Sequence, residues 1–229
     1  IRVNVPSVFV YGGAALPGRF QGKDVTVLDS YEAVGAVQTG QMKEESLKQL
    51  ERIAIPAIGA CAGQFTANTM AMVSETLGLA LPGSATLPAV DSQRKEFARK
   101  AGETVMRILK SGGPLPRDLV TKKSLENAAA AVAATGGSTN AALHLPAIAH
   151  EAGIRFTLDD FARVAKRTPL IADMKPGGRF LAKDLHAVGG VYSVLKALLA
   201  HGSLHGDCLT LSGSTLEKAL AAMRAPAPK

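Results

Sequence analysis

The chain has 229 residues, of which 47% are hydrophobic and 20% charged, the composition of a folded domain large enough to bury a full core. Its two cysteines, Cys61 and Cys208, exclude a disulfide-stapled secreted scaffold and a complete four-cysteine zinc or iron–sulfur site within these residues. The net charge of +7 comes from basic residues dispersed without interleaved aromatics, which argues against nucleic-acid binding, and no apolar run of about 18 residues predicts a transmembrane helix.

The first half of the chain predicts one strand followed by helices. Residues 5–11 form a short β-branched and aromatic run that stops at two glycines, which predicts a buried strand. A loop that contains glycine and proline is expected next, at residues 14–23. Apolar residues then recur at helical spacing, which predicts four helices at 25–37, 42–55, 66–79 and 91–110. In the last of these, the inward face is expected to hold Phe97, Ala101, Val105 and Ile108.

The second half continues the helical pattern. An alanine-rich run predicts a helix over residues 124–134, with Ser124 as its N-cap. Thr157 begins a sequence that resembles a capping box, which predicts a helix directly after it. Further elements are expected as helices at 141–152, 191–200 and 215–223, and as a short strand within 204–212. We therefore predict one helix-rich α/β unit with few short strands over residues 1–223, and a linker at 224–229 toward a C-terminal domain.

Cys61 is the first candidate for chemistry, and it lies among small residues just before a predicted helix. The free N–H groups at a helix N-terminus and the helix dipole favour negative charge, which predicts a lowered pKa for the Cys61 thiol. A thiolate at this place is a nucleophile or a metal ligand, and the flanking Gly59 and Gly63 leave room for a bulky group. The alternative is that Cys61 is a small buried hydrophobic residue.

Several polar residues carry two interpretations each. Thr66 and Asn68 either donate hydrogen bonds near a bound group or serve as the N-cap and a first-turn polar residue of their helix. Residues 138–140 follow two glycines, and they either cradle a carboxylate or cap the next helix. Asp173 and Lys175 flank a turn, where a salt bridge or a surface loop is the simpler interpretation.

A second group of metal-ligand residue types lies near the C-terminal end: His201, His205, Asp207 and Cys208. Such residues can form a metal site. The intervening glycine and serine leave the two histidines free to lie on different faces. A buried turn, with Cys208 as an inert core thiol, is therefore the alternative interpretation.

Long motifs in a fixed order identify a resemblance to a known family. Residues 59–70 read Gly-Ala-Cys-Ala-Gly-Gln-Phe-Thr-Ala-Asn-Thr-Met, and residues 75–84 read Glu-Thr-Leu-Gly-Leu-Ala-Leu-Pro-Gly-Ser. The match continues at residues 136–145, 158–161, 172–178, 184–185, 189–190 and 204–207. Over nearly its whole length the chain resembles the middle and end of the N-terminal domain of the dihydroxy-acid dehydratase family, which also includes sugar-acid dehydratases.

The resemblance implies a part of an iron–sulfur hydro-lyase. In this family three cysteines hold a cluster, of the [2Fe–2S] or [4Fe–4S] type, that leaves one iron open to substrate. Cys61 matches the third cysteine, which makes it a cluster ligand rather than a nucleophile, and Thr66 and Asn68 are expected beside it as further cofactor-binding residues. The other two cysteines, the Mg²⁺ ligands and the serine proposed as base have no counterpart in this chain, so no catalytic residue is expected within it.

The reaction that the resemblance implies is the dehydration of a small dihydroxy acid. The open iron acts as a Lewis acid on the C3 hydroxyl, Mg²⁺ holds the carboxylate and the C2 hydroxyl, and a base removes the C2 proton, so that an enol forms and becomes a 2-keto acid. Residues 64–70 favour the enzyme of valine and isoleucine synthesis, which acts on 2,3-dihydroxy-3-methyl acids. The alternatives are a sugar-acid (aldonate) dehydratase and a non-catalytic remnant of the fold. The parent protein is expected to be a cytoplasmic homodimer without a membrane or nucleic-acid partner, and the chain alone is expected to be inactive.

Overall fold

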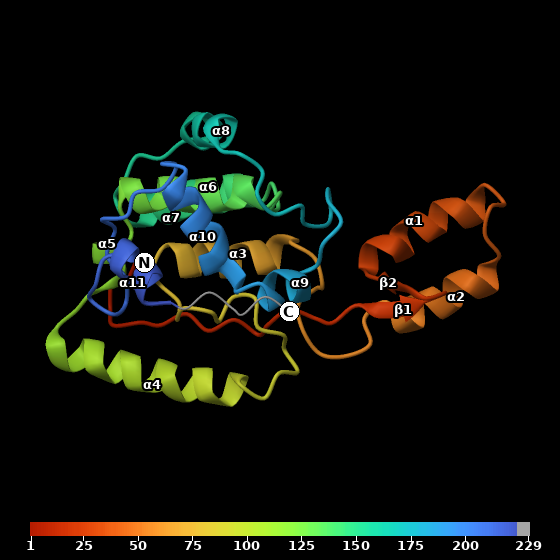
Figure 1. Ribbon diagram of the computed structural model, residues 1–229, viewed down its shortest axis with the longest axis horizontal. Helices are drawn as coiled ribbons and strands as arrows, with labels where there is room; N and C mark the ends of the chain where they lie inside the picture. The colour runs from red at the N-terminus through yellow and green to blue at the C-terminus, as the bar shows by residue number, and fades with distance from the viewer. Residues whose placement is uncertain (224–229) are drawn as a thin grey trace.

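Two central helices, α3 and α6, organise the chain, and the other helices of the main body pack around them (Figure 1). The computed structural model describes residues 1–223, so the predicted linker at 224–229 lies outside the described residues. In chain order the elements are β1 Gly18–Phe20, β2 Lys23–Val25, α1 Val27–Gln38, α2 Glu44–Ile53, α3 Thr66–Thr76, α4 Arg94–Ser111, α5 Pro116–Leu119, α6 Lys122–Ala134, α7 Ala141–Glu151, α8 Leu158–Arg167, α9 Ala182–Ala187, α10 Gly190–Ala200 and α11 Leu216–Ala222. Within the described residues, eleven helices and one antiparallel hairpin confirm the predicted helix-rich unit with few short strands.

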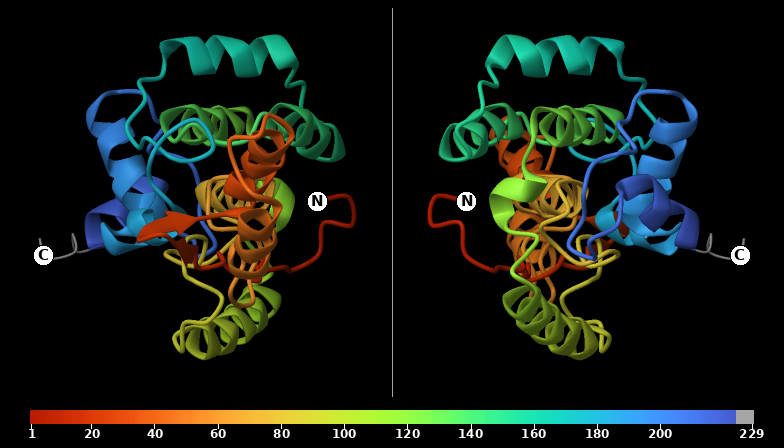
Figure 2. Two further views of the ribbon diagram at one scale, coloured as in Figure 1. Left: turned by 90° about the vertical axis from the view of Figure 1, so that its right-hand side faces the viewer. Right: turned by 90° about the vertical axis from the view of Figure 1, so that its left-hand side faces the viewer.

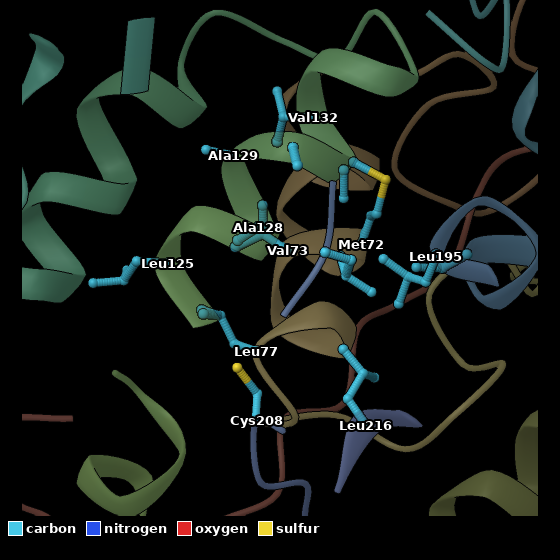
Figure 3. Packing of buried hydrophobic residues seen from close by; sticks show 14 of the residues in the cluster. Met72, Val73, Leu77, Leu125, Ala128, Ala129, Val132, Leu195, Cys208 and Leu216 are labelled. Carbon is cyan, nitrogen blue, oxygen red and sulfur yellow. The ribbon is translucent and has the colours of Figure 1, made fainter. Parts of the chain in front are cut away.

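The main hydrophobic core lies where α3, α6 and α10 meet. Leu125 and the alanines at 128–131 of α6 are buried, as are Met72 and Val73 of α3 (Figure 3). Alanine side chains let two helices approach closely, and the larger side chains of α3 fill the remaining space beside them. The alanine-rich run is therefore a packing surface as well as a strong helix former.

Helices cover this core on opposite sides. α8 lies over α6 on one side, and the long α4 lies on the other side of α3, as Figure 1 and Figure 2 show. Ala101 and Ile108 of α4 are buried, at inward positions that the helical spacing predicts. Thr157 begins α8 with the predicted capping box: its Oγ1 accepts the Asp160 N–H at 3.3 Å, and the Asp160 carboxylate accepts the Thr157 N–H at 2.9 Å.

Residues 5–11 do not form the buried strand that their composition predicts. Val5 and Val10 are 49% and 56% exposed. This run pairs with other backbone through an isolated bridge between Phe9 and Ala80. The Phe9 N–H donates to the Leu79 carbonyl, just after the end of α3. The prediction is wrong because β-branched residues form a strand only where a neighbouring strand supplies a ladder, and no such neighbour lies beside this run among the described residues.

Two further expectations need correction. The predicted strand within 204–212 is wrong, because Leu209 makes one isolated bridge to Thr215 and the ladder does not extend. The N-cap of α6 is Thr121 rather than Ser124: the Thr121 Oγ1 accepts the Ser124 N–H at 3.1 Å, and the Ser124 Oγ accepts the Thr121 N–H at 2.8 Å. Ser124 is thus the third helical residue and the partner of the cap, so the polar residue that begins the helix lies earlier than the alanine pattern suggests.

The hairpin and the first two helices, residues 18–53, form a small lobe that projects from the main body (Figure 1). We call it the hairpin lobe. Its small core includes Val25 and Leu50. Gly18 is required at its base, because a Cβ there would lie 1.7 Å from the Ile53 carbonyl oxygen. The hairpin begins within the predicted loop at 14–23, and α5 and α9 lie where the sequence predicts no element, because such short elements show no usable period.

Candidate functional site

Cys61 lies in the loop between α2 and α3, at residues 59–65, which we call the Cys61 loop. The Cys61 carbonyl accepts the Ala15 N–H at 3.1 Å. Gly59 has a φ of +135°, and a Cβ there would lie 2.5 Å from the Ala15 nitrogen. Glycine is therefore required where the two segments meet, and the loop is anchored to the chain that precedes the hairpin lobe.

Asn68 holds the Cys61 loop from the first turn of α3. Its Nδ2 donates to the carbonyl oxygens of Cys61 and Gly63, both at 2.7 Å, and lies 3.8 Å from the Cys61 Sγ. Asn68 is 5% exposed, so these bonds are shielded from water. Both hydrogens of the amide are used on backbone carbonyls. The structure thus brings together two of the predicted site residues, Cys61 and Asn68.

A third contact comes from residues 174–183, which we call the clamp segment. The Lys175 carbonyl accepts the Gln64 N–H at 2.7 Å, and the Ala62 carbonyl accepts the Ala182 N–H at 2.8 Å. Both bonds are made by loop residues that directly follow Cys61 in the sequence. Sequence reasoning did not assign the clamp segment to the site, because the contacts are backbone bonds between distant residues. The sequence feature that could have pointed to this segment is the family-like motif at residues 172–178.

Thr66 contacts the polar run at residues 138–140 instead of capping α3. The N-cap position belongs to Phe65, and Thr66 is the first helical residue, so the expected capping role of Thr66 is wrong. Its Oγ1 accepts a hydrogen bond from the Asn140 Nδ2 at 2.7 Å and lies 3.2 Å from the Ser138 Oγ. Asn140 makes no side-chain cap bond to α7, so its side chain links α7 to α3 instead.

The Cys61 thiol is partly buried, and this burial raises its pKa against the opposing effect of the Phe65 and Asn68 N–H groups. The predicted lowering of the pKa is wrong. α3 begins only at Thr66, and the helix dipole acts mainly within the first turn. Cys61 is therefore a neutral thiol at neutral pH, and a metal ion that binds it displaces its proton.

Cys208 lies in the hydrophobic core rather than beside Cys61 (Figure 3). Its Sγ is 3.4 Å from the Asn127 Nδ2, and burial raises the pKa of the thiol to about 11. This is the environment of an inert structural cysteine. Within residues 1–223, no group of three His, Cys, Asp or Glu side chains is close enough to hold a metal ion. Among the described residues, Cys61 is thus the accessible thiol, and a cluster bound there needs further ligands.

The other metal-ligand residue types near Cys208 face separate partners. The contacts are His201 Nδ1 with Ser203 Oγ at 2.8 Å, His205 Nε2 with Glu126 Oε2 at 2.9 Å, and the Asp207 carboxylate with the Lys123 ammonium. Asn127 also bonds both backbone groups of His205, at 2.7 and 2.9 Å. Residues 201–208 therefore form a turn whose polar side chains bond to separate partners, as the alternative to a metal site predicts. Asp173 and Lys175 likewise each form an ion pair, with Arg179 and Asp29.

Replacement of Asn68 with alanine is expected to lower the Tm of the protein by about 4–8 °C, since two buried carbonyls lose donors at a cost of roughly 2 kcal/mol. Thermal unfolding followed by circular dichroism measures the change. Asn140→Ala removes an exposed amide bonded to Thr66 and is the matched control, with an expected change below about 2 °C. A Tm for Asn68→Ala equal to that of the original protein would show that Asn68 does not support the loop.

Comparisons with known proteins identify close relatives. A family model described as the dihydroxy-acid/6-phosphogluconate dehydratase N-terminal region matches residues 1–219. Dihydroxy-acid dehydratase 2 of Bordetella bronchiseptica is 66% identical over 226 residues, which are 99% of this chain and 40% of that protein. The dihydroxy-acid dehydratase of Parvibaculum lavamentivorans is 61% identical over 94% of this chain and 37% of its own length. For dihydroxy-acid dehydratase 3 of Bradyrhizobium diazoefficiens the identity is 56%, over 99% of this chain and 39% of that protein. The chain thus spans about 40% of the length of these curated relatives.

Proposed function

The chain belongs to the dihydroxy-acid/6-phosphogluconate dehydratase family as part of its N-terminal domain, and from this membership we propose that it is a segment of a dihydroxy-acid dehydratase. The longer enzyme would dehydrate 2,3-dihydroxy-3-methyl acids to 2-keto acids in valine and isoleucine synthesis. Identities of 56–66% to relatives named dihydroxy-acid dehydratases support this substrate class. The structural observation that carries the proposal is the Cys61 loop, whose backbone is held by hydrogen bonds from three separate segments.

The surroundings of Cys61 fit one corner of an iron–sulfur cluster. The thiol is part-exposed while its backbone is tied down, and its neighbours Ala60, Ala62 and Gly63 are small. Asn68, whose Nδ2 bonds the Cys61 carbonyl and lies 3.8 Å from the Cys61 Sγ, is a neighbour of the kind that orients a metal ligand from its surroundings. Since no three His, Cys, Asp or Glu side chains within residues 1–223 lie close enough to hold a metal ion, we propose that the remaining cluster ligands belong to parts of the longer protein outside this chain.

A cluster bound at Cys61 would supply a Lewis acid for the departing hydroxyl of the substrate. The chain's own residues would position it, with Asn68 fixing the loop backbone from the first turn of α3 and Thr66, on the same turn, bonded to Asn140 of α7. Mg²⁺ does not fit the residues described, because no group of carboxylates within 1–223 offers it a ligand set. We propose that its ligands and the base also lie outside this chain.

A substrate assay decides between the two classes that the family description names. The full-length enzyme is purified without oxygen, and 2-keto acid formation is measured with 2,3-dihydroxy-3-methylbutanoate and with an aldonate. We expect kcat/KM to be at least about tenfold higher for the methyl-branched acid, because a pocket shaped for the branched chain leaves sugar hydroxyls without partners. A preference for the aldonate would make the protein a sugar-acid dehydratase. No turnover of either substrate by the reconstituted enzyme would make it a non-catalytic remnant.

We also propose that the 229-residue chain alone is inactive and that the longer enzyme is a cytoplasmic homodimer. A single accessible thiol among the described residues supports the first statement. We expect no 2-keto acid from the isolated chain after anaerobic reconstitution with iron and sulfide, and measured turnover would contradict the proposal. Sedimentation of the full-length enzyme tests the dimer. No helix within residues 1–223 has both the length and the apolar character to cross a membrane.

A further inference from the structure

The hairpin lobe has a core that is separate from the main core. Val25, Ala33 and Leu50 form its buried cluster, with Phe20 and Ile53 packed against them. None of these residues belongs to the main cluster around α3 and α6. The apolar packing of the main body therefore does not set the orientation of the lobe, and its polar attachments to the main body become important.

Two ion pairs join the hairpin lobe to the clamp segment. The Lys175 Nζ lies 3.5 Å from the Asp29 Oδ2, and Lys183 pairs with Asp24. The side chains of Lys175 and Asp29 are 22% and 26% exposed, so solvent screens this pair less than a surface pair. Asp29 also accepts the Thr26 N–H at 2.6 Å in the capping box of α1. Lys175 thus meets the lobe at the capped N-terminus of α1.

Lys175 contacts the Cys61 loop through its own backbone. Its carbonyl accepts the Gln64 N–H at 2.7 Å, and Gln64 is 1% exposed. Its N–H donates to the Phe180 carbonyl at 2.8 Å, which closes the clamp segment on itself. One residue therefore bonds to the hairpin lobe with its side chain and to the Cys61 loop with its main chain.

We propose that Lys175 is a positioning residue that couples the hairpin lobe to the exposure of Cys61. The ion pair with Asp29 holds the clamp segment in place, and the clamp segment holds the backbone at Gln64. Loss of the pair increases the time that the clamp segment spends detached, and Cys61 is then more accessible. The inference goes beyond the proposed cluster role, because it concerns the thiol and its surroundings with or without a bound cluster.

The test measures the alkylation rate of Cys61 by iodoacetamide in the metal-free full-length protein, followed by mass spectrometry of the Cys61 peptide. Lys175→Met keeps the backbone and most of the side-chain stem but removes the charge. We expect Cys61 to react about two- to fivefold faster in this variant, the range that loss of one partly exposed pair allows. Lys175→Arg restores the charge and should restore the original rate. Because the thiol is the readout, the result does not depend on whether Cys61 binds a cluster.

Two internal controls separate coupling from general loss of stability. Cys208 is buried in the main core, so its alkylation reports global opening and should stay unchanged in Lys175→Met. Lys48→Met removes a lysine of the hairpin lobe that pairs with Glu44 at 2.8 Å, far from the clamp segment in sequence, and should leave the Cys61 rate unchanged. Equal acceleration of Cys61 and Cys208 in Lys175→Met, or the same effect from Lys48→Met, would overturn the proposal.

Salt gives a second measurement that needs no variant. At roughly 1 M sodium chloride the screening length falls to about 3 Å, so the Lys175–Asp29 pair weakens. We expect the Cys61 rate to rise more with salt in the original protein than in Lys175→Met, in which Lys183–Asp24 is the remaining ion pair between the two segments. A Cys61 rate that is the same in low and high salt, or the same in Lys175→Met and the original protein, would show that the pair does not control the site.

Discussion

Replacement of Cys61 with serine is expected to lower the turnover of the full-length enzyme by about 100-fold or more and to remove most of its bound iron and sulfide. Loss of a residue that merely supports a metal ligand costs about 10–100-fold in affinity or activity, and loss of the ligand itself costs at least as much. A serine hydroxyl stays protonated where a thiol gives up its proton to the metal, so it does not replace the ligand. Iron and sulfide analysis, the visible spectrum of the cluster and 2-keto acid formation measure the effect.

Cys208 provides the matched control for this prediction. It is the other cysteine of the chain, and it lies in the main core beside Asn127. Cys208→Ser changes the same atom in a place without solvent access, so its effect should be limited to stability, with iron content and turnover close to those of the original enzyme. A Cys61→Ser enzyme with full iron content and full turnover would contradict the ligand role of Cys61.

The second large effect concerns Glu75, a buried carboxyl group that is the first residue of the family-like motif at residues 75–84. It is 1% exposed, and its two oxygens accept the Gly83 N–H at 2.8 Å and the Ala85 N–H at 2.9 Å. Burial raises the pKa of Glu75 to about 7, although these N–H groups act in the opposite direction. Glu75 holds the loop after α3 in place, and it is protonated in a large fraction of molecules at neutral pH.

This raised pKa makes the stability of the fold depend on pH. The unfolded chain has an ordinary glutamate pKa of about 4.5, below the folded value of about 7. The stabilising contribution of the protonated group is therefore fully present below pH 4.5 and is lost as the pH rises through 7. Between pH 5 and pH 8 the free energy of unfolding is expected to fall by roughly 2–3 kcal/mol because of this residue.

Glu75→Gln isolates the contribution, because glutamine is neutral throughout the range. At pH 5 the variant is expected to be less stable than the original protein, since its amide leaves one of the two backbone N–H groups without an acceptor. The difference in unfolding free energy should then shrink by roughly 2–3 kcal/mol toward pH 8. Urea denaturation at a series of pH values measures it. The comparison cancels other titrating groups such as His186, whose pKa is lowered by burial.

The exposed Glu32 supplies the control for this series, because Glu32→Gln is expected to change the unfolding free energy by less than about 0.5 kcal/mol at any pH. A constant difference between Glu75→Gln and the original protein from pH 5 to pH 8 would show that Glu75 keeps the same charge in the folded and unfolded chain. That outcome would place the pKa of the buried carboxyl near its ordinary value.

Much of the local structure was predictable from the sequence, because it depends on neighbours along the chain. The spacing of apolar residues in α4 identified the buried face at Ala101 and Ile108, and the capping box at Thr157 identified the start of α8. The motif around Cys61 identified the family, which the match over residues 1–219 confirms. These features depend on side chains within a few residues of one another, so a linear pattern contains the necessary information.

Expectations failed where the outcome depends on distant partners. The run at residues 5–11 has strand composition but no neighbouring strand, and the Cys61 thiol lies before a helix but in an environment whose burial raises its pKa. Thr66 looked like a cap, yet its hydroxyl bonds to Asn140 on another helix. In each case a long-range contact outweighed the local preference.

Local patterns along the chain are enough to establish its helical character, its family and the cysteine that is the candidate ligand. The tertiary structure alone decided how that cysteine is held: by Asn68 from α3, by the backbone of the clamp segment, and through Lys175 by the hairpin lobe. The physical reason is that hydrogen bonds and ion pairs between distant residues depend on where the packed core places them. No repeating pattern in the sequence indicates which distant residues the core brings together.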